Sequence, residues 1–398
     1  MQSNNRTLEK FELYSLYALV FFLPLFEAPK NIAVAAYLIL WATRAFLSNS
    51  WGGAWGKWDT LSVSIILAGI GSIYFGLYPT NNGTAAIGDI LSYTLVFMCL
   101  QRTPLNENTI RNIFVIAIGS TALTLGWGYW LHFHSHATGA LQLNSVGHVN
   151  HSAIYLGIII AMTLTMAIIE KSIKTRLIYL TLAIFFIYSI FIMAARGAIV
   201  PLALFIALVI FIHTKNTKSM IIYATASIIA LTAVLSLAPG ILNKTTGNFS
   251  NENYTSKRLE LANTAIAAAK ESPIFGVGLN NFRKITEPEV KSWVEQGHRT
   301  YNPDHFFYTS HAHNLYFNTL AERGALGLLA VLGLLGMLGL HLFSTRPQQG
   351  QSASVLWYGA MGGWIIVVFG GIFNTTLHHE HGMLAMMLLG GWLSSQKT

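Results

Sequence analysis

Runs of about 20 consecutive apolar residues recur along nearly the whole chain, and they constrain its fold more than any other feature. A helix needs about 20 apolar residues to cross roughly 30 Å of hydrocarbon. The runs are continuously apolar and do not alternate, which excludes the strands of a membrane barrel. We expect twelve transmembrane helices, near residues 11–27, 31–47, 60–78, 84–101, 112–131, 151–170, 177–193, 197–213, 219–239, 324–343, 354–373 and 382–395.

The composition excludes a soluble fold. Hydrophobic residues make up 53% of the 398 residues and charged residues only 10%, and the mean hydropathy is +0.50. A soluble protein of that composition would have too few polar residues to cover its surface. The expected fold is therefore an all-α polytopic membrane protein of about 12 transmembrane helices, with one large loop that contains helices of its own.

Basic residues in the short loops predict the orientation, because they mark the cytoplasmic side of a membrane protein. If both termini are cytoplasmic, thirteen Lys and Arg residues of the short loops lie inside, and only Lys30 and Arg196 lie outside. The loop at 240–323 is left out of this comparison, because long loops cross the membrane regardless of charge. We expect this loop on the outer side. The topology explains most of the net charge of +8, and no basic stripe interleaved with aromatic residues predicts nucleic-acid binding.

The apolar run from about 177 to 212 has to turn back on itself. As one helix it would be roughly 54 Å long, nearly twice the thickness of the hydrocarbon. Arg196 and Gly197 are the natural apex, and Pro201 is tolerated in the first turn of the returning helix. A guanidinium beside a helix N-terminus suits an anion such as phosphate. The alternative is that Arg196 only extends to the outer membrane interface.

The outer loop contains a predicted amphipathic helix with two basic residues at its start. Apolar residues at 259, 262, 266 and 269 share one helical face, Thr255 or Ser256 is the expected cap, and Pro273 ends the helix. Basic side chains oppose the dipole in a first helical turn, so Lys257 and Arg258 are candidates for anion binding. The alternative is a solvated charged face.

The segment 311–314 (HAHN) leads into a glycine-rich helix. Gly324, Gly327, Gly333, Gly336 and Gly339 form the small-residue pattern that lets membrane helices approach closely, so we expect a packed helix. A histidine at the outer end of this helix, neutral near pH 7, is suited to act as a general base. The alternative is a histidine that only forms hydrogen bonds at the membrane interface.

Two further histidine groups are candidates for metal binding, and we expect both on the outer side. They contain His132, His134, His136, His148 and His151, and His378, His379 and His381. Neither has a zinc-protease spacing, and histidines two residues apart do not share a helix face, so we predict no metal site. Asp89 is the one acid well inside a predicted span, and we expect it to pair with a base or line a cavity.

The order of these motifs resembles the bacterial O-antigen ligases, in the group that also contains O-antigen polymerases and protein O-oligosaccharyltransferases. The most specific element is His313-Asn314, nine residues, then Gly324-x-x-Gly327. Segments 194–198 (AARGA), Arg258 followed by 273–278 (PIFGVG), and 149–156 (VNHSAIYL) resemble the other motifs of the family. On these matches the predicted catalytic residues are Arg196, Arg258 and His313. The predicted substrate-binding residues are Asn314, His311, Asn150, His151 and Lys257.

The resemblance implies a GT-C-like glycosyltransferase of lipopolysaccharide biosynthesis in the bacterial inner membrane. Its reaction is the transfer of O-antigen polysaccharide from undecaprenyl pyrophosphate to a sugar hydroxyl of lipid A-core at the periplasmic face, with inversion and without metal, nucleotide or other cofactor. The outer aromatic residues Trp293, Tyr301, Phe306, Phe307 and Tyr308 would then pack on sugars or hold the loop on the membrane.

Two alternatives stay open at the level of sequence. The nearest is an O-antigen polymerase, whose acceptor is a second carrier-linked glycan. A different class is a lipid or glycan transporter, which should show related halves or broken helices at the midplane, whereas the polar residues here gather at one surface. In either case we expect one integrated membrane domain, with helices in 1–239, the outer loop and catalytic segment in 240–323, and helices in 324–398. The oligomeric state and the roles of Asp89 and of the His378, His379 and His381 group are not predictable from the sequence.

Overall fold

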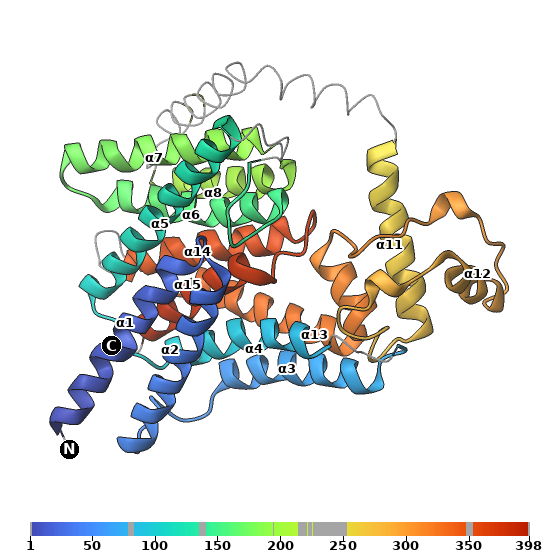
Figure 1. Cartoon of the computed structure of the whole chain (residues 1–398), viewed down its shortest axis with the longest axis horizontal. Helices are drawn as coiled ribbons and strands as arrows, with labels where there is room; N and C mark the ends of the chain where they lie inside the picture. Colours follow the sequence, from blue (N-terminus) through green and yellow to red (C-terminus); the bar gives the residue numbers. More distant parts are fainter. Residues whose placement is uncertain are drawn as a thin grey trace.

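The computed structural model describes residues 2–78, 83–134, 141–193, 195–213, 221, 225, 253–347 and 353–396. Within these residues the chain forms α-helices and three 3₁₀-helices and no strand (Figure 1). The prediction of an all-α fold is confirmed. The order is α1(Gln2–Phe22), α2(Glu27–Leu47), α3(Lys57–Phe75), α4(Gly83–Leu100), α5(Glu107–His134), α6(Val149–Ile169), α7(Ile173–Ile192), η1(Arg196–Ala198), α8(Ile199–His213), α11(Asn253–Glu271), η2(Phe282–Lys284), α12(Glu287–Gln296), η3(Pro303–His305), α13(Leu315–Ser344), α14(Ala353–Gly370) and α15(His379–Ser395).

The helices have the length and surface of an integral membrane protein. Six of the described helices are long and apolar enough to cross a membrane, and three shorter apolar helices accompany them. Their outer faces expose large apolar side chains: on α2, Ile32, Ile39 and Phe46 are 70%, 65% and 76% exposed. Eleven of the twelve predicted spans overlap a described helix, in α1 to α8 and α13 to α15. The ninth, 219–239, lies largely outside the described residues.

The core of the helix bundle is formed around α6, α14 and α15. Most side chains of α6 and α15 are buried, and α14 packs against both. Helices with apolar residues on every face are expected in such a position, because they have no polar face to turn outward. These central helices hold the N-terminal end of α6 and the loop between α14 and α15 next to each other.

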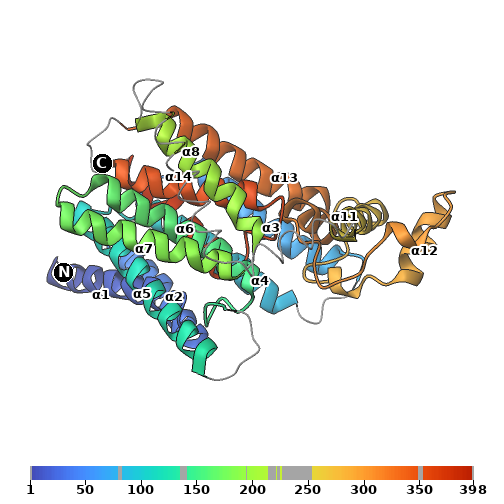
Figure 2. The ribbon, with the colours of Figure 1, turned by 90° about the horizontal axis from the view of Figure 1, so that it is seen from above.

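The described part of the predicted outer loop, 253–323, forms a small subdomain with a hydrophobic core of its own. Nine buried residues make up this core: Leu261, Ala265, Ala268, Val277, Phe282, Ile285, Val290, Ala312 and Ala321. The aromatic residues that we expected on sugars or on the membrane pack against it, and Tyr301 stacks on Phe306 at 5.5 Å between ring centroids. Figures 1 and 2 show that this subdomain lies at the end of the molecule away from both termini.

Helix α11 differs in two details from its prediction. It begins at Asn253, so Thr255 and Ser256 lie within the helix and not at its expected start. Of the predicted face, Ala262 and Ala269 are buried and Ile266 is half-buried, but Leu259 is 67% exposed, and the adjacent Leu261 and Ala265 are buried too. The small alanines of this segment left its apolar face ambiguous, and tertiary packing shifted it towards Leu261 and Ala265. The helix ends at Glu271, just before Pro273, as predicted.

Helix α13 contains a kink that explains two of the sequence motifs. Gly324 has φ 61° and ψ −164°, values that a residue with a Cβ rarely adopts. At this kink the backbone N–H of Ala325 donates to Pro273 at 2.8 Å, and that of Val277 donates to Ala321 at 2.8 Å. A Cβ on Gly324 would lie 2.2 Å from the Ile274 carbonyl oxygen. The 273–278 turn and the glycine motif are therefore two halves of one backbone junction.

The kink also divides α13 into two segments that pack against different parts of the molecule. The helix has 30 residues, about 45 Å, which exceeds the roughly 30 Å of hydrocarbon. Its first nine residues, which precede the predicted span at 324–343, belong with α11 and the outer subdomain. The expected close packing along the glycine stripe holds at Gly339, which approaches Trp364, but not at Gly336, which has no neighbour within 4 Å of a built Cβ.

Candidate active site

The predicted turn between α7 and α8 is confirmed. Helix α7 ends at Ile192, Arg196–Ala198 forms the 3₁₀-helix η1, and Pro201 lies in the first turn of α8. The side chain of Arg196 lies outside the described part of the structure. The backbone of its neighbour Gly197 approaches Phe373 closely. A Cβ placed on Gly197 would lie 3.0 Å from the Phe373 Cβ. The backbone of the turn is thus held against the loop that follows α14.

Asn314 caps α13 and ties it to that same loop. Its Oδ1 accepts from the backbone N–H groups of Tyr316 and Phe317 at 2.9 and 3.0 Å, and its Nδ2 donates to the Ile372 carbonyl at 2.9 Å. A capping side chain satisfies amides that otherwise lack a partner. These contacts give Asn314 a structural task, and its predicted contact with substrate stays a prediction.

His313, the residue before this cap, is half-buried in a left-handed backbone conformation with φ 48°. Burial lowers its pKa below the ordinary value, the positive charge of Arg258 lowers it further, and a side-chain interaction with Asn374 partly opposes these effects. His311 lies beside it, with 4.4 Å between ring centroids, and burial together with His313 lowers the pKa of His311 to about 4. Both rings are therefore neutral at pH 7, the state that a general base requires.

Arg258 reaches the same place from α11. Its Nη1 donates to the Phe373 carbonyl oxygen at 3.2 Å, and its guanidinium lies 5.6 Å from the centre of the Phe373 ring. The side chain is exposed. Phe373 thus contacts both Arg258 and the turn that carries Arg196, so three segments far apart in the sequence meet beside His313.

The other predicted substrate-binding residues lie at different distances from His313 and Arg258. Lys257 turns away onto the Phe307 ring, with 5.1 Å from Nζ to the centroid. Asn150 lies in the first turn of α6, where its backbone N–H donates to His148 Nδ1 at 3.2 Å. His148 in turn lowers the pKa of His313 and of His311. His151 is buried at the same end of α6, 6.4 Å from His311 between ring centroids.

Sequence reasoning missed the loop at 371–378, which holds these elements together. The loop contacts Asn314 and Arg258 as described above. In addition, its Gly371 carbonyl oxygen accepts from the Leu315 N–H at 2.7 Å. Thr376 Oγ1 donates to Val367 at 2.5 Å, and the Thr375 carbonyl lies 3.1 Å from His381 Nε2. The available signal was a short connection between two apolar spans in which nearly every residue after Phe373 can form hydrogen bonds.

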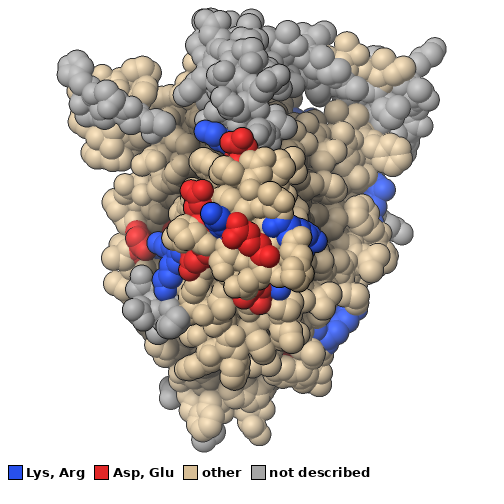
Figure 3. Space-filling model, turned by 90° about the vertical axis from the view of Figure 1, so that its right-hand side faces the viewer, with Lys and Arg blue, Asp and Glu red and all other residues tan. Residues whose placement is uncertain are grey.

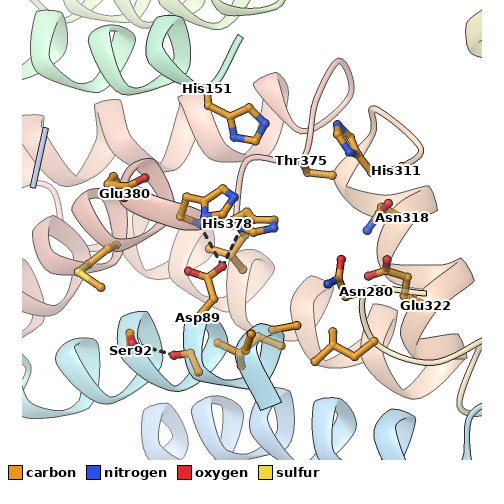
Figure 4. Close-up of a pocket in the computed structure, with 18 of the residues that line it drawn as sticks. Asp89, Ser92, His151, Asn280, His311, Asn318, Glu322, Thr375, His378 and Glu380 are labelled. Carbon is orange, nitrogen blue, oxygen red and sulfur yellow. Dashed lines mark hydrogen bonds and ion pairs between the residues drawn. The ribbon is translucent and has the colours of Figure 1, made fainter. Parts of the chain in front are cut away.

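A cavity of about 850 Å³ lies next to this loop. Figure 4 shows Asp89 pointing from α4 toward His378, with His151 above them and His311, Asn318 and Glu322 around the same space. The Asp89 carboxylate forms an ion pair with His378 Nδ1 at 2.7 Å and accepts from the His379 N–H at 3.1 Å. Burial alone would lower the pKa of His378, but the Asp89 carboxylate outweighs it and the pKa is raised. The predicted pairing of Asp89 with a base is confirmed.

The two histidine groups of the sequence come together only in part. His148 and His151 lie near His311 and the 378–381 segment, whereas His132 and His134 are exposed at the end of α5, and His136 lies outside the described residues. Asp89, His378 and His379 offer three ligand atoms within 4.8 Å of one another. Asp89 and His378 already pair with each other. Structural zinc sites use four protein ligands, whereas catalytic zinc sites use three together with a water molecule. The absence of a metal stays a prediction.

Comparison with known families agrees with the geometry. A family model described as O-antigen ligase matches residues 180–332. This segment is similar to the O-antigen ligase family. The match contains Arg196, Arg258, His313 and the Gly324-x-x-Gly327 motif, and it ends within α13. The family supports an activity of the O-antigen ligase or polymerase class on lipid-linked glycans. No curated protein matches the chain.

Proposed function

We propose that the protein is an O-antigen ligase that transfers the polysaccharide from undecaprenyl pyrophosphate to a sugar hydroxyl of lipid A-core. The observation that carries the proposal is the meeting of His313, Arg258 and the Arg196 turn around Phe373. A neutral base beside a guanidinium fits a reaction that removes a proton from a hydroxyl and places charge on phosphate. The predicted location is the periplasmic face of the bacterial inner membrane, with both termini in the cytoplasm.

The proposed step is a single displacement. The acceptor hydroxyl oxygen attacks the anomeric carbon of the donor sugar from the face opposite the carrier, and His313 takes the hydroxyl proton. The bond between the anomeric carbon and the pyrophosphate oxygen breaks, its electron pair stays on the pyrophosphate, and the configuration inverts. The lowered pKa of His313 keeps the ring neutral before the step.

The arginines act on the leaving group. Negative charge grows on the pyrophosphate oxygen as the bond breaks, and a guanidinium can donate two parallel hydrogen bonds to such a group. Arg258 is exposed and close to His313, and the backbone of Arg196 lies in the turn packed on Phe373. No step requires a metal or a nucleotide.

The test is transfer in vitro from purified undecaprenyl-pyrophosphate glycan to purified lipid A-core, in EDTA and without nucleotide. We expect the wild-type protein to form the glycosylated lipid A-core and His313→Ala to lose at least about a hundredfold in rate, because general bases contribute that much. An intact wild type that transfers nothing to lipid A-core, but lengthens carrier-linked glycan, is instead a polymerase. Activity that disappears in EDTA would contradict the metal-free mechanism.

A further inference from the structure

The cavity beside the active site is separate from the place where Arg258 lies. Phe373, at one position of the 371–378 loop, contacts Arg258, whereas Thr375, Leu377 and His378 of the same loop line the cavity. His311 also lines the cavity, and its neighbour His313 is influenced by Arg258. The His311–His313 pair therefore lies between two cationic regions.

The buried arginine of the cavity is Arg323, which sequence reasoning counted only among the basic residues of the loop at 240–323. It is 7% exposed, lines the cavity and donates from Nη2 to Thr319 Oγ1 at 2.9 Å. Its Nε and Nη1 are buried and form no hydrogen bond of normal geometry, although the Tyr93 side chain lies close enough to interact with the guanidinium. Buried guanidinium donors without acceptors are costly, which indicates that a ligand supplies the acceptors.

Several other charged groups of the cavity have partners within the protein, and the exposed Arg283 at its rim donates to the neutral Asn280 Oδ1. Lys30 pairs with Glu380, and Asp89 pairs with His378. Glu322, which precedes Arg323, accepts from the Phe282 N–H at 3.3 Å. Among the described residues no carboxylate forms an ion pair with Arg323, so its charge remains available to an anionic group.

The walls of the cavity are amphipathic. Val34, Ala35 and Leu38 of α2 and Ala85 and Ala86 of α4 give it an apolar side, whereas Arg323, Asn318 and His311 give it a polar side. Such a lining suits a glycolipid whose charged head group lies next to its acyl chains.

We propose that this cavity binds the acceptor glycolipid, with Arg323 Nε and Nη1 donating to a phosphate or carboxylate group of its head. The inference rests on the proposed function, because a transferase with two anionic lipid substrates needs a second anion-binding site besides the one at Arg258. The guanidinium fork is suited to either oxyanion.

Direct binding tests the site independently of transfer. The purified full-length protein in nanodiscs is titrated with lipid A-core, with the same material after dephosphorylation, and with the undecaprenyl-pyrophosphate glycan. The variants are Arg323→Gln and Arg111→Gln. Arg111 is exposed and pairs with Glu170 far from the cavity. Arg111→Gln is therefore the matched control, because it also removes one arginine charge. We expect Arg323→Gln to weaken lipid A-core binding at least about tenfold, about 1.4 kcal/mol, and to leave binding of the donor unchanged.

Dephosphorylation identifies the group. If it weakens binding to wild type as much as the substitution does, the group is a phosphate; if binding persists and still depends on Arg323, it is a carboxylate. Should Arg323→Gln not fold, Thr319→Val removes the hydrogen bond that orients the guanidinium, and we expect about a threefold loss. Equal lipid A-core affinity of wild type and variant, no binding by wild type, or an equal loss of donor affinity would overturn the proposal. Arg323-dependent binding without transfer would instead reject the ligase function and leave the site standing.

Discussion

Three arginines at the end of the helix bundle that holds the termini differ in their partners from two at the opposite end. Arg176, which is also near the termini, is an exception because it donates to the Glu170 carbonyl oxygen at 2.7 Å. At the end that holds the termini, Arg44, Arg102 and Arg111 each form an ion pair with a carboxylate, at 2.5, 2.8 and 2.7 Å. At the other end, Arg258 donates to a carbonyl oxygen and Arg323 to a hydroxyl. A carboxylate partner balances an arginine's charge within the protein, whereas a hydrogen bond to a neutral acceptor does not. We therefore expect the first group to stabilise the fold and the second to take part in the proposed function.

The face of the molecule shown in Figure 3 does not reveal this difference. Figure 3 looks onto the end that carries α12, where acidic and basic side chains are intermixed and form no basic patch. The functional contrast lies in hydrogen-bond partners and burial, so it is best tested by substitutions at single residues.

Arg258→Lys should have the largest effect. Lysine keeps the charge but cannot reproduce the two parallel N–H groups of the guanidinium. We expect transfer to fall about a hundred- to a thousandfold, as when one transition-state donor is removed, with unchanged protein yield and thermal stability. Initial rates at saturating acceptor measure the effect. Near-normal activity would remove Arg258 from the leaving-group role.

Gly324→Ala should act on stability at the same end. The new Cβ would meet backbone atoms of Ile274 and Phe275 at a residue with φ 61°, so we expect a loss of about 2–4 kcal/mol in the free energy of unfolding. Gly336→Ala is the matched control, because its Cβ meets nothing within 4 Å. Thermal unfolding in detergent compares the two variants. Equal unfolding temperatures would mean that the 273–278 turn moves away at little cost.

Arg102→Gln should destabilise the opposite end without affecting transfer. Its loss leaves the buried Asp59 carboxylate without its charged partner, although Gln101 and the Gly56 N–H still donate to it at 3.0 and 2.8 Å. We expect a cost of about 2 kcal/mol and unchanged transfer per folded molecule. A specific loss of transfer would contradict the division between the two ends.

The pH dependence should show the smallest effect. His313 acts as a base only when neutral, and its lowered pKa keeps it neutral at pH values where an ordinary histidine, with a pKa of about 6.5, is half protonated. We expect kcat/KM to remain above half of its maximum at pH 6.5 and to fall as the pH drops through the lowered pKa. A half-maximum above pH 6.5 would exclude His313 as the group that titrates.

The sequence predicted those features that depend on local pattern. The run around Arg196 is too long for one crossing, and Pro273 cannot continue α11, so the turn at η1 and the end of α11 followed from chain geometry. The long-range contacts could not be predicted in this way. Nothing near Phe373 in the sequence indicates that its carbonyl accepts from a residue 115 positions earlier. Arg323 shows its importance only through the partners that it lacks.

The kink at Gly324 also fixes the distance, along the axis of α13, between itself and the segment that carries His313. Nine helical residues, 315–323, separate it from the segment that carries His313, about 13 Å along the helix axis. Backbone hydrogen bonds from Ala325 and Val277 fix this stretch to the outer subdomain, so the distance is set by main-chain geometry and not by a flexible hinge. In the proposed reaction, the acceptor would have to present its hydroxyl at this fixed distance from the kink.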